Sequence, residues 1–314
     1  MKKILIIKPS SFGDIIQALP CANALKQIYP DCRITWVVFK HWSAILKLCP
    51  DIDEIIEWDR KGGISAFVKT LKFIRKTNFD LIIDLQGLLR SAFLARFAKG
   101  KLKIGMPGMR EGSGILIKEA YPESAKINAS LRNLEPVRFI SGKSFKPRVN
   151  IEINSSLSAF ANLLLSKNKI SKKFISLIPF ARGKGKDWSV ENYISLISLI
   201  NKKYPKTDIV VLGLQKDYGR FLANNKVIDL CGQTDLLLLA AILSKSQAAI
   251  GADTGSMHLA CVLNIPSVFI FGNSDIIETS PKIGRFSLLL NKENPKAIND
   301  IQPQTVLKEI EILL

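Results

Sequence analysis

Short apolar runs alternate with longer helical patterns along this 314-residue chain, and this alternation restricts the fold more than any other feature of the sequence. A short apolar run predicts a buried strand, whereas apolar residues at steps of three and four predict a helix. In the first half, strands are predicted at residues 4–8, 34–39, 54–58 and 80–85, and helices at 14–28, 65–76 and 87–98. Strands that alternate with helices of this length imply parallel βαβ units.

The alternation weakens over residues 141–173, a stretch rich in Ser, Lys and Asn that we expect to connect two domains. It then restarts, with strands predicted at 174–179, 208–213, 226–230, 248–251, 267–271 and 286–290, and helices at 190–204, 235–244, 255–263 and 304–314. The predicted fold class is therefore α/β, with two doubly wound, Rossmann-like domains (residues 1–160 and 161–314) that face a central cleft. Because ligands of such sheets bind beyond the carboxyl ends of the strands, the loops that follow strands carry the candidate functional residues.

Positive charge is concentrated in the first half of the chain. The chain has 45 Lys and Arg against 27 Asp and Glu, a net charge of +18, and residues 60–148 alone hold 19 basic and 6 acidic side chains. A local excess of this size indicates an anionic partner, and nucleic acid, anionic lipid and a phosphorylated glycolipid all fit. The alternative interpretation is that these lysines are simply solvated and have no partner.

Several classes of protein are disfavoured by what the sequence lacks. No apolar run reaches the roughly 18–20 residues that span a bilayer, and the apolar segment at residues 4–7 is too short for a signal-peptide core. The five cysteines are scattered without a CxxC pair, and there are only two histidines. We therefore expect a soluble, cytosolic enzyme with neither a disulfide framework nor a zinc site.

The loop between the first predicted strand and helix contains Gly13 and Asp14. Glycine allows close backbone approach, and a carboxylate at the start of a helix can cap the free N–H groups. Two interpretations of Asp14 remain open at this point. It is either only a helix cap or a general base that takes a proton from an acceptor hydroxyl.

Two further loops, both in the second half, favour anion binding. Residues 250–260 end a strand and begin a helix, so the N–H groups of Thr254, Gly255 and Ser256 form a ready anion site. His258 lies about one turn into that helix and either reaches the same anion or packs in the core. The loop at residues 179–188 places three cations and two glycines between a strand and a helix, which suits a diphosphate leaving group better than a solvated turn. A base in one domain and a diphosphate site in the other are what group transfer from a nucleotide-activated donor requires.

Four segments of the sequence together resemble one known family. They are KPSSFGDIIQALP (residues 8–20), FDLIIDLQGLLRS (79–91), KDW (186–188) and DTGSMHLA (253–260). In this order they resemble the signatures of the bacterial lipopolysaccharide heptosyltransferases, glycosyltransferase family 9, and the first two are closest to heptosyltransferase I. The resemblance implies a GT-B fold, inversion at the sugar carbon and no essential metal or cofactor. It also allows the last helix to pack back on the first domain.

The resemblance also implies roles for individual residues. The donor would be ADP-L-glycero-β-D-manno-heptose and the acceptor the Kdo sugar of Kdo–lipid A, with Asp14 as the base. The implied donor-binding residues are Arg182, Lys186, Asp217, Asp253, Thr254, Gly255 and His258, and Lys186 also has a catalytic role. The implied acceptor-binding residues are Ser10, Ser11, Gly13, Arg60, Gln86 and Arg110.

The sequence departs from this family at a few positions. Gln17 stands where many type I members have His, Ala181 and Arg182 replace a polar Thr pair, and Asn128 falls near a position that is often His. The alternatives are a family member that uses another nucleotide sugar or a later core acceptor such as heptose. A nucleic-acid-binding protein, suggested only by the charge, lacks a recognisable motif. A Rossmann oxidoreductase is disfavoured because no GxGxxG follows the first strand.

The resemblance implies a partner for the basic first half of the chain, namely Kdo–lipid A in the inner membrane. Lipid A and Kdo are densely anionic, and the inner leaflet carries negative charge. The helical segments 65–76 and 87–101 mix cations with Phe67, Phe73, Leu88, Leu89, Phe93 and Phe97. They are expected either to dock on the membrane or to place these rings in the core. The expected location is the cytoplasm, with peripheral contact to the inner membrane and no binding of nucleic acid.

Overall fold

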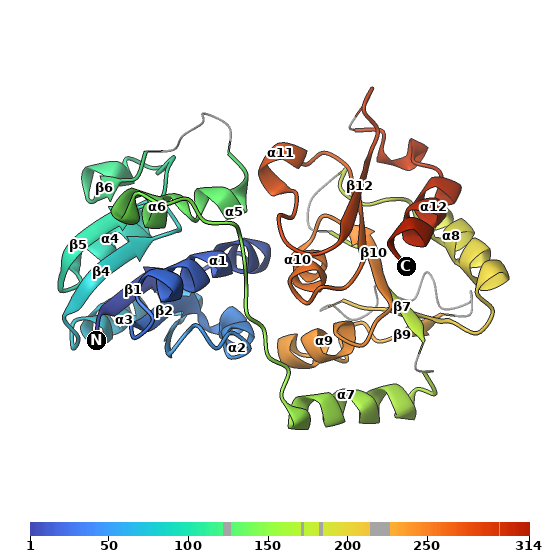
Figure 1. Ribbon diagram of the computed structural model, residues 1–314, viewed down its shortest axis with the longest axis horizontal. Helices are drawn as coiled ribbons and strands as arrows, with labels where there is room; N and C mark the ends of the chain where they lie inside the picture. Colours follow the sequence, from blue (N-terminus) through green and yellow to red (C-terminus); the bar gives the residue numbers. More distant parts are fainter. Residues whose placement is uncertain (122–126, 171–172, 182–184, 214–226, 295) are drawn as a thin grey trace. The chain divides into compact units, whose positions relative to one another are not determined.

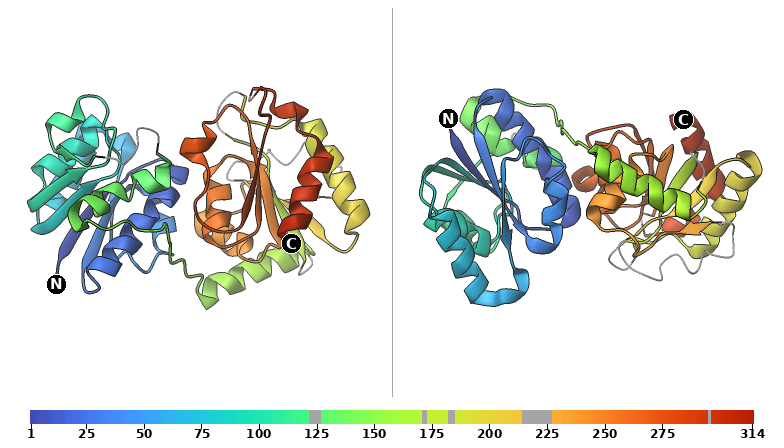
Figure 2. Two further views of the ribbon diagram at one scale, coloured as in Figure 1. Left: turned by 45° about the horizontal axis from the view of Figure 1, so that its top comes forward. Right: turned by 90° about the horizontal axis from the view of Figure 1, so that it is seen from below.

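The computed structural model describes residues 1–121, 127–170, 173–181, 185–213, 227–294 and 296–314. The chain forms two compact units, Met1–Glu152 (unit 1) and Ile153–Leu314 (unit 2). Each unit is built on a six-stranded parallel sheet with helices on both faces (Figures 1 and 2). The expected division between residues 160 and 161 falls inside helix α7 (Ser155–Lys167), which belongs to unit 2.

The sheet of unit 1 has the strand order β3-β2-β1-β4-β5-β6. Strand β1 lies near the centre because Ile4, Leu5, Ile6 and Ile7 have no exposed surface and need neighbours on both sides. From β1 the chain adds β2 and β3 on one side of the sheet, and it then crosses over and adds β4, β5 and β6 on the other side. Ligands of such sheets bind at this reversal, beyond the carboxyl ends of β1 and β4. The strands are β1 (Lys3–Ile7), β2 (Arg33–Phe39), β3 (Glu54–Trp58), β4 (Phe79–Asp84), β5 (Gly100–Gly105) and β6 (Lys118–Glu119).

Right-handed crossovers place the helices of unit 1 on the two faces of its sheet. Helix α1 packs against α5 and α6, and α3 and α4 lie next to each other, since Arg75 Nη1 donates to the Phe97 carbonyl at 3.4 Å. The expected strands and long helices are all found to within a few residues, but β5 and β6 were not predicted. The helices are α1 (Phe12–Ile28), α2 (Ser43–Leu46), α3 (Gly63–Ile74), α4 (Leu89–Phe97), α5 (Ala129–Arg132) and α6 (Glu135–Ser141), with 3₁₀ turns at Lys40–Trp42, Arg60–Gly62 and Ser113–Ile115.

The sheet of unit 2 repeats the same topology, with the order β12-β11-β10-β7-β8-β9. Its chain reversal lies between β7 and β10, so the loops after these two strands meet at one edge. These are the loops from which anion binding was predicted. The strands are β7 (Phe174–Ile178), β8 (Asp208–Val211), β9 (Ile228–Asp229), β10 (Ala248–Ala252), β11 (Ser267–Phe271) and β12 (Phe286–Leu290).

The helices of unit 2 close the core on both sides of the sheet. Helix α12 packs on α8, β11 and β12 of its own unit, with Val306 and Ile310 in the core beside Trp188. Helix α7 packs on α9, so the stretch expected to be a connection contains a helix. The helices are α7, α8 (Val190–Lys203), α9 (Leu236–Leu243), α10 (Gly255–Val262), α11 (Ile276–Thr279) and α12 (Pro303–Leu313), with a 3₁₀ turn at Ile298–Asp300.

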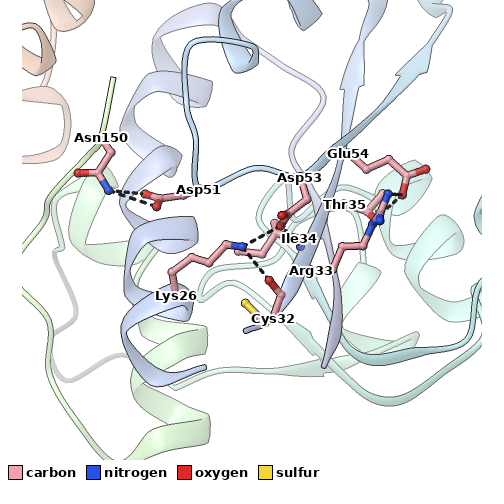
Figure 3. A network of polar contacts seen from close by, with 9 residues as sticks. All are labelled: Lys26, Cys32, Arg33, Ile34, Thr35, Asp51, Asp53, Glu54 and Asn150. Atoms are coloured by element: carbon pink, nitrogen blue, oxygen red, sulfur yellow. Dashed lines mark hydrogen bonds and ion pairs between the residues drawn. The ribbon is translucent and has the colours of Figure 1, made fainter. Parts of the chain in front are cut away.

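A polar network holds the amino ends of β2 and β3 in unit 1 (Figure 3). Lys26, at the end of α1, donates to Asp53 at 2.9 Å and to the Cys32 carbonyl at 2.7 Å. Asn150 donates to both carboxylate oxygens of Asp51 at 3.2 Å, which fixes the end of unit 1 onto its own sheet. This network lies at the opposite end of the strands from the loops expected to carry function.

The described residues contain no helix long and apolar enough to cross a membrane. All five cysteines are buried free thiols. Within the same residues, no group of three or more His, Cys, Asp or Glu is arranged to hold a metal ion.

Candidate functional site

Asp14 occupies the first turn of α1, directly after the loop that follows β1. Ser11 donates to Asp14 Oδ2 twice, from its backbone N–H at 2.9 Å and from its hydroxyl at 2.7 Å. Within the described part of the chain, the other carboxylate oxygen, Oδ1, accepts no hydrogen bond. The side chain is therefore oriented by one oxygen and presents the other, which suits a cap and a general base equally well.

The loop after β4 meets this helix at the chain reversal of the sheet. Gln86 Oε1 accepts from the Ser10 backbone N–H at 3.3 Å. The structure thus brings together, at the carboxyl ends of β1 and β4, five of the predicted acceptor-side residues: Ser10, Ser11, Gly13, Asp14 and Gln86. Arg110 is tied to the same loop, since its N–H donates to the Gly87 carbonyl at 2.8 Å.

A fully buried carboxylate, Asp84, shapes the loop that holds Gln86. Asp84 Oδ1 accepts from the N–H groups of Gln86 and Gly87 at 2.9 and 3.2 Å, and Oδ2 accepts from the Ser91 hydroxyl at 2.9 Å. Burial raises the pKa of Asp84 to about 6, against the opposing effect of these hydrogen bonds and of Lys8. Asp84 stands within the motif at residues 79–91, but the motif alone indicates no role for it.

We expect this buried carboxyl to make folding stability depend on pH. The pKa rises from 3.8 when unfolded to about 6 when folded, so between these values the folded state holds a proton that the unfolded state has lost. The free energy of unfolding therefore falls by up to about 3 kcal/mol as the pH rises from 4 to 6. Urea unfolding across this range should show a shallower fall for Asp84→Asn, and parallel curves for the two proteins would contradict the assignment.

Cations surround this end of the sheet. Lys8 is buried and donates to the Leu85 carbonyl at 2.8 Å. Burial lowers the pKa of Lys8, Asp14 and Asp84 raise it, and Arg132 and Arg110 lower it further. Three cations and two carboxylates therefore interact electrostatically at this end of the sheet. The excess of positive charge suits an anionic ligand.

Arg60 begins the 3₁₀ turn after β3 and extends its side chain to the carboxyl end of β2. Its guanidinium is 5.8 Å from the centre of the Phe39 ring, and the guanidinium of Arg90 is 5.5 Å from the same ring. Arg90 was not among the predicted site residues, although it stands in the quoted motif that ends at Ser91. The structure reveals it because the first turn of α4 places the Arg90 guanidinium near Phe39 at the end of β2, which no spacing in the sequence indicates.

In unit 2, α10 begins directly after β10 and its first turn provides N–H groups. Thr254 is the N-cap, and its hydroxyl accepts from the Met257 N–H at 3.3 Å. The N–H groups of Gly255 and Ser256 have no acceptor one turn earlier in the helix, so they can bind an anion. Gly251 lets β10 approach β7, since a Cβ there would lie 2.2 Å from the Ile178 carbonyl oxygen.

Asp253 and His258 form a largely buried pair beside this helix start. His258 Nε2 and Asp253 Oδ1 are 3.2 Å apart, and the His258 ring lies 5.4 Å from the ring of Phe269. Burial would raise the pKa of Asp253, but His258, Ser274 and Lys186 outweigh it and the pKa is lowered. Asp253 is therefore an anion that can accept hydrogen bonds, and Lys186 lies close enough to act on it.

The loop that carries Lys186 is anchored on both sides. Trp188 is buried and its indole N–H donates to the Ile301 carbonyl at 3.0 Å. On the other side, the Asn273 N–H donates to the Gly185 carbonyl at 3.1 Å. Gly272 is required here, because a Cβ would lie 2.3 Å from the Gly185 oxygen. Lys186 is half-buried between these anchors, and its charge contributes to the lowered pKa of Asp253.

Two of the predicted donor residues lie outside the part of the chain that the structure describes. These are Arg182 and Asp217. Of the residues at which the sequence departs from the family, Gln17 is buried in α1, and Asn128 is the N-cap of α5. The remaining predicted donor residues, Lys186 and Asp253 to His258, gather at the chain reversal of unit 2.

The sequence model of Glycosyltransferase family 9 (heptosyltransferase) matches residues 67–308. A similar curated protein is a lipopolysaccharide heptosyltransferase 1 from Campylobacter coli, 27% identical, with 99% of this chain and 98% of that protein covered.

Two solved structures share the fold over almost their whole length. The glycosyltransferase family 9 protein of Veillonella parvula has a TM-score of 0.88 at 20% identity, with 99% of this chain and 97% of that chain covered. The ADP-heptose lipopolysaccharide heptosyltransferase II of E. coli has a TM-score of 0.83 at 22% identity, with 100% and 98% covered. The chain therefore has the two-domain α/β fold called GT-B, as predicted.

Proposed function

Because this chain belongs to glycosyltransferase family 9, we propose that it is a lipopolysaccharide heptosyltransferase that uses ADP-L-glycero-β-D-manno-heptose as donor and the Kdo region of the inner core as acceptor. The proposal rests on the polar residues that lie beyond β1 and β4 in unit 1 and beyond β7 and β10 in unit 2. Unit 1 presents an oriented carboxylate, Asp14, among cations, and unit 2 presents a helix start, Lys186 and Asp253. A base and a diphosphate site are the two parts that inverting transfer needs.

The proposed reaction forms one bond and breaks one. The acceptor hydroxyl oxygen attacks the anomeric carbon of the heptose, and Asp14 Oδ1 takes the hydroxyl proton. The bond from that carbon to the diphosphate oxygen breaks, and ADP leaves with the electron pair. Lys186 and the N–H groups of Gly255 and Ser256 stabilise the charge that develops on the diphosphate. In this scheme these groups supply the positive charge, and no cofactor takes part.

The donor and acceptor are inferred from separate features. An ADP-sugar donor is supported by the likeness to an E. coli protein described with ADP-heptose. An anionic acceptor is supported by the cations at the carboxyl ends of β1 and β2: Lys8, Arg60, Arg90, Arg110 and Arg132. Such a lipid-borne acceptor would place the enzyme at the cytoplasmic face of the inner membrane. Transfer to a heptose acceptor is a second candidate. It is favoured because the chain is similar over its whole length to an enzyme described as heptosyltransferase II.

The proposal is tested by mass spectrometry of the product made by the purified protein from ADP-heptose. We expect one heptose to be added to Kdo–lipid A and none to an acceptor that already carries heptose. Addition only to the heptosylated acceptor would establish the type II reaction instead. If neither acceptor is modified with ADP-heptose, but ADP is released when a different ADP-sugar is supplied as donor, the proposed substrates are wrong. The assignment as a glycosyltransferase would then still hold.

A further inference from the structure

Helix α3 (Gly63–Ile74) packs Phe67, Leu71 and Ile74 toward its own unit but leaves three further apolar residues facing solvent. It buries only Thr70 and Ile74, while Ile64 is 84% exposed, Val68 40% and Phe73 46%. Helices of this protein that cover a sheet, such as α8, bury their apolar residues instead. Three exposed apolar side chains on one helix favour a surface that is covered when the protein works.

The charged side chains within α3 and directly after it are all positive. From Arg60 to Phe79 the sequence has six cations and no acidic residue. Within the helix and its end, Lys69, Lys72, Arg75 and Lys76 are exposed. A continuous run of this kind has no internal ion pairs to neutralise it, so an external anionic partner is favoured.

The apolar groups and the cations share one face. Ile64, Val68 and Lys72 follow one another at four-residue steps, and Lys69, Phe73 and Lys76 form the neighbouring stripe. At the end of the helix, Arg75 contacts Phe97, which is itself 47% exposed at the end of α4. The exposed face is therefore a mixture of apolar tips and ammonium groups, which matches the boundary between lipid headgroups and acyl chains.

The position of α3 connects this face to the candidate site. The 3₁₀ turn that leads into α3 carries Arg60, whose guanidinium lies beside Phe39 at the carboxyl end of β2. A bilayer against α3 would thus lie next to the end of the sheet where Asp14 is found. A lipid-anchored acceptor could then present its sugar to that end without leaving the membrane.

From these observations we propose that the exposed face of α3, formed by Ile64, Val68, Lys69, Lys72, Phe73 and Lys76, docks this protein on an anionic lipid bilayer. The inference rests on the proposed function only for the identity of the acceptor. The docking itself follows from the apolar exposure and the unopposed positive charge. A second copy of the chain would bring like charges together on this face, which disfavours a symmetric dimer through it.

Flotation of the full chain with lipid vesicles tests the docking without any enzymatic step. We expect binding to phosphatidylcholine vesicles that contain phosphatidylglycerol, weakening as salt is added, and little binding to phosphatidylcholine alone. The triple variant Lys69→Gln, Lys72→Gln, Lys76→Gln should lower the partition coefficient roughly 100-fold, since each cation near such a surface contributes roughly 5-fold. The double variant Ile64→Ser, Val68→Ser should lower it roughly 10-fold or more through the loss of buried apolar surface.

A matched control comes from α7 of unit 2, which exposes Phe160 and Leu163 but lacks the run of cations. The double variant Phe160→Ser, Leu163→Ser should bind vesicles as the wild type does. Equal loss of binding in the α7 variant, or unchanged binding in the α3 variants, would overturn the proposal. So would a dimer in sedimentation that dissociates in the α3 variants, because that face would then be an interface between copies.

A second readout separates the docking from the proposed function. The α3 variants should lower kcat/KM for the acceptor embedded in vesicles and leave kcat/KM for a short, water-soluble Kdo acceptor unchanged. Vesicle binding without transfer to either acceptor would retain the docking surface and reject the substrates. Transfer to both acceptors with wild-type efficiency in the triple variant would reject the docking surface and retain the function.

Discussion

Asp14→Asn is expected to slow heptose transfer by roughly 10²–10⁴-fold, the range in which general base catalysis contributes. The amide retains an oxygen that can accept from the Ser11 N–H and hydroxyl, so the start of α1 keeps its shape. What is lost is the basic oxygen that takes the proton from the acceptor. Single-turnover release of ADP in the presence of acceptor measures the effect.

Two measurements show whether this loss is chemical. ADP binding should be unchanged in Asp14→Asn, because the predicted donor residues belong to unit 2. Asp31→Asn, an exposed carboxylate of the same unit, should transfer heptose at the wild-type rate. Turnover of Asp14→Asn close to that of the wild type would show that Asp14 only caps α1.

Lys186→Ala is expected to have the second largest effect. A charged hydrogen bond contributes roughly 10- to 100-fold to binding, so the Kd for ADP should rise by about that factor. The rate of transfer should fall further, by roughly 10²–10³-fold, since the charge on the departing diphosphate is greatest in the transition state. Calorimetric titration with ADP and single-turnover kinetics give the two values separately.

The fold should survive this substitution. Trp188 and Gly272, which anchor the loop on either side of Lys186, keep their contacts with Ile301 and Gly185. Lys206→Ala removes an exposed lysine of the same unit and should change neither value. If Lys186→Ala binds ADP and transfers heptose as Lys206→Ala does, Lys186 has no part in the donor site.

Much of the candidate site could be predicted because it follows from the order of strands and loops. In a sheet of this type the first strand lies beside the strand with which the chain changes direction, and the loops that follow these two strands meet at one edge. In unit 1 the two strands are β1 and β4, and in unit 2 they are β7 and β10. The loop that leads to Asp14 meets Gln86 through Ser10, and Lys186 comes near enough to Asp253 for its charge to act there. Their roles in the reaction remain predictions that the two substitutions above address.

The parts that could not be predicted depend on burial. Strand β5 alternates Lys101 and Lys103 with Leu102 and Ile104, a pattern that does not form the continuous apolar run of a central strand. Helix α7 lies in a polar stretch and buries only Ala161 and Leu165, so its sequence resembles a linker. Both elements are stabilised by the neighbours they pack against rather than by a strong pattern of their own.

The sequence by itself determined most of the strands and long helices, the parallel arrangement of both sheets, and the loops that hold the candidate base and the anion site. These features depend on local periodicity and on chain order, which a sequence contains directly. The tertiary structure alone decided which charges are buried and which apolar groups are exposed. Asp84 is enclosed among N–H donors, Arg90 meets Arg60 at Phe39, and Ile64 faces solvent, because each outcome depends on how distant segments cover one another.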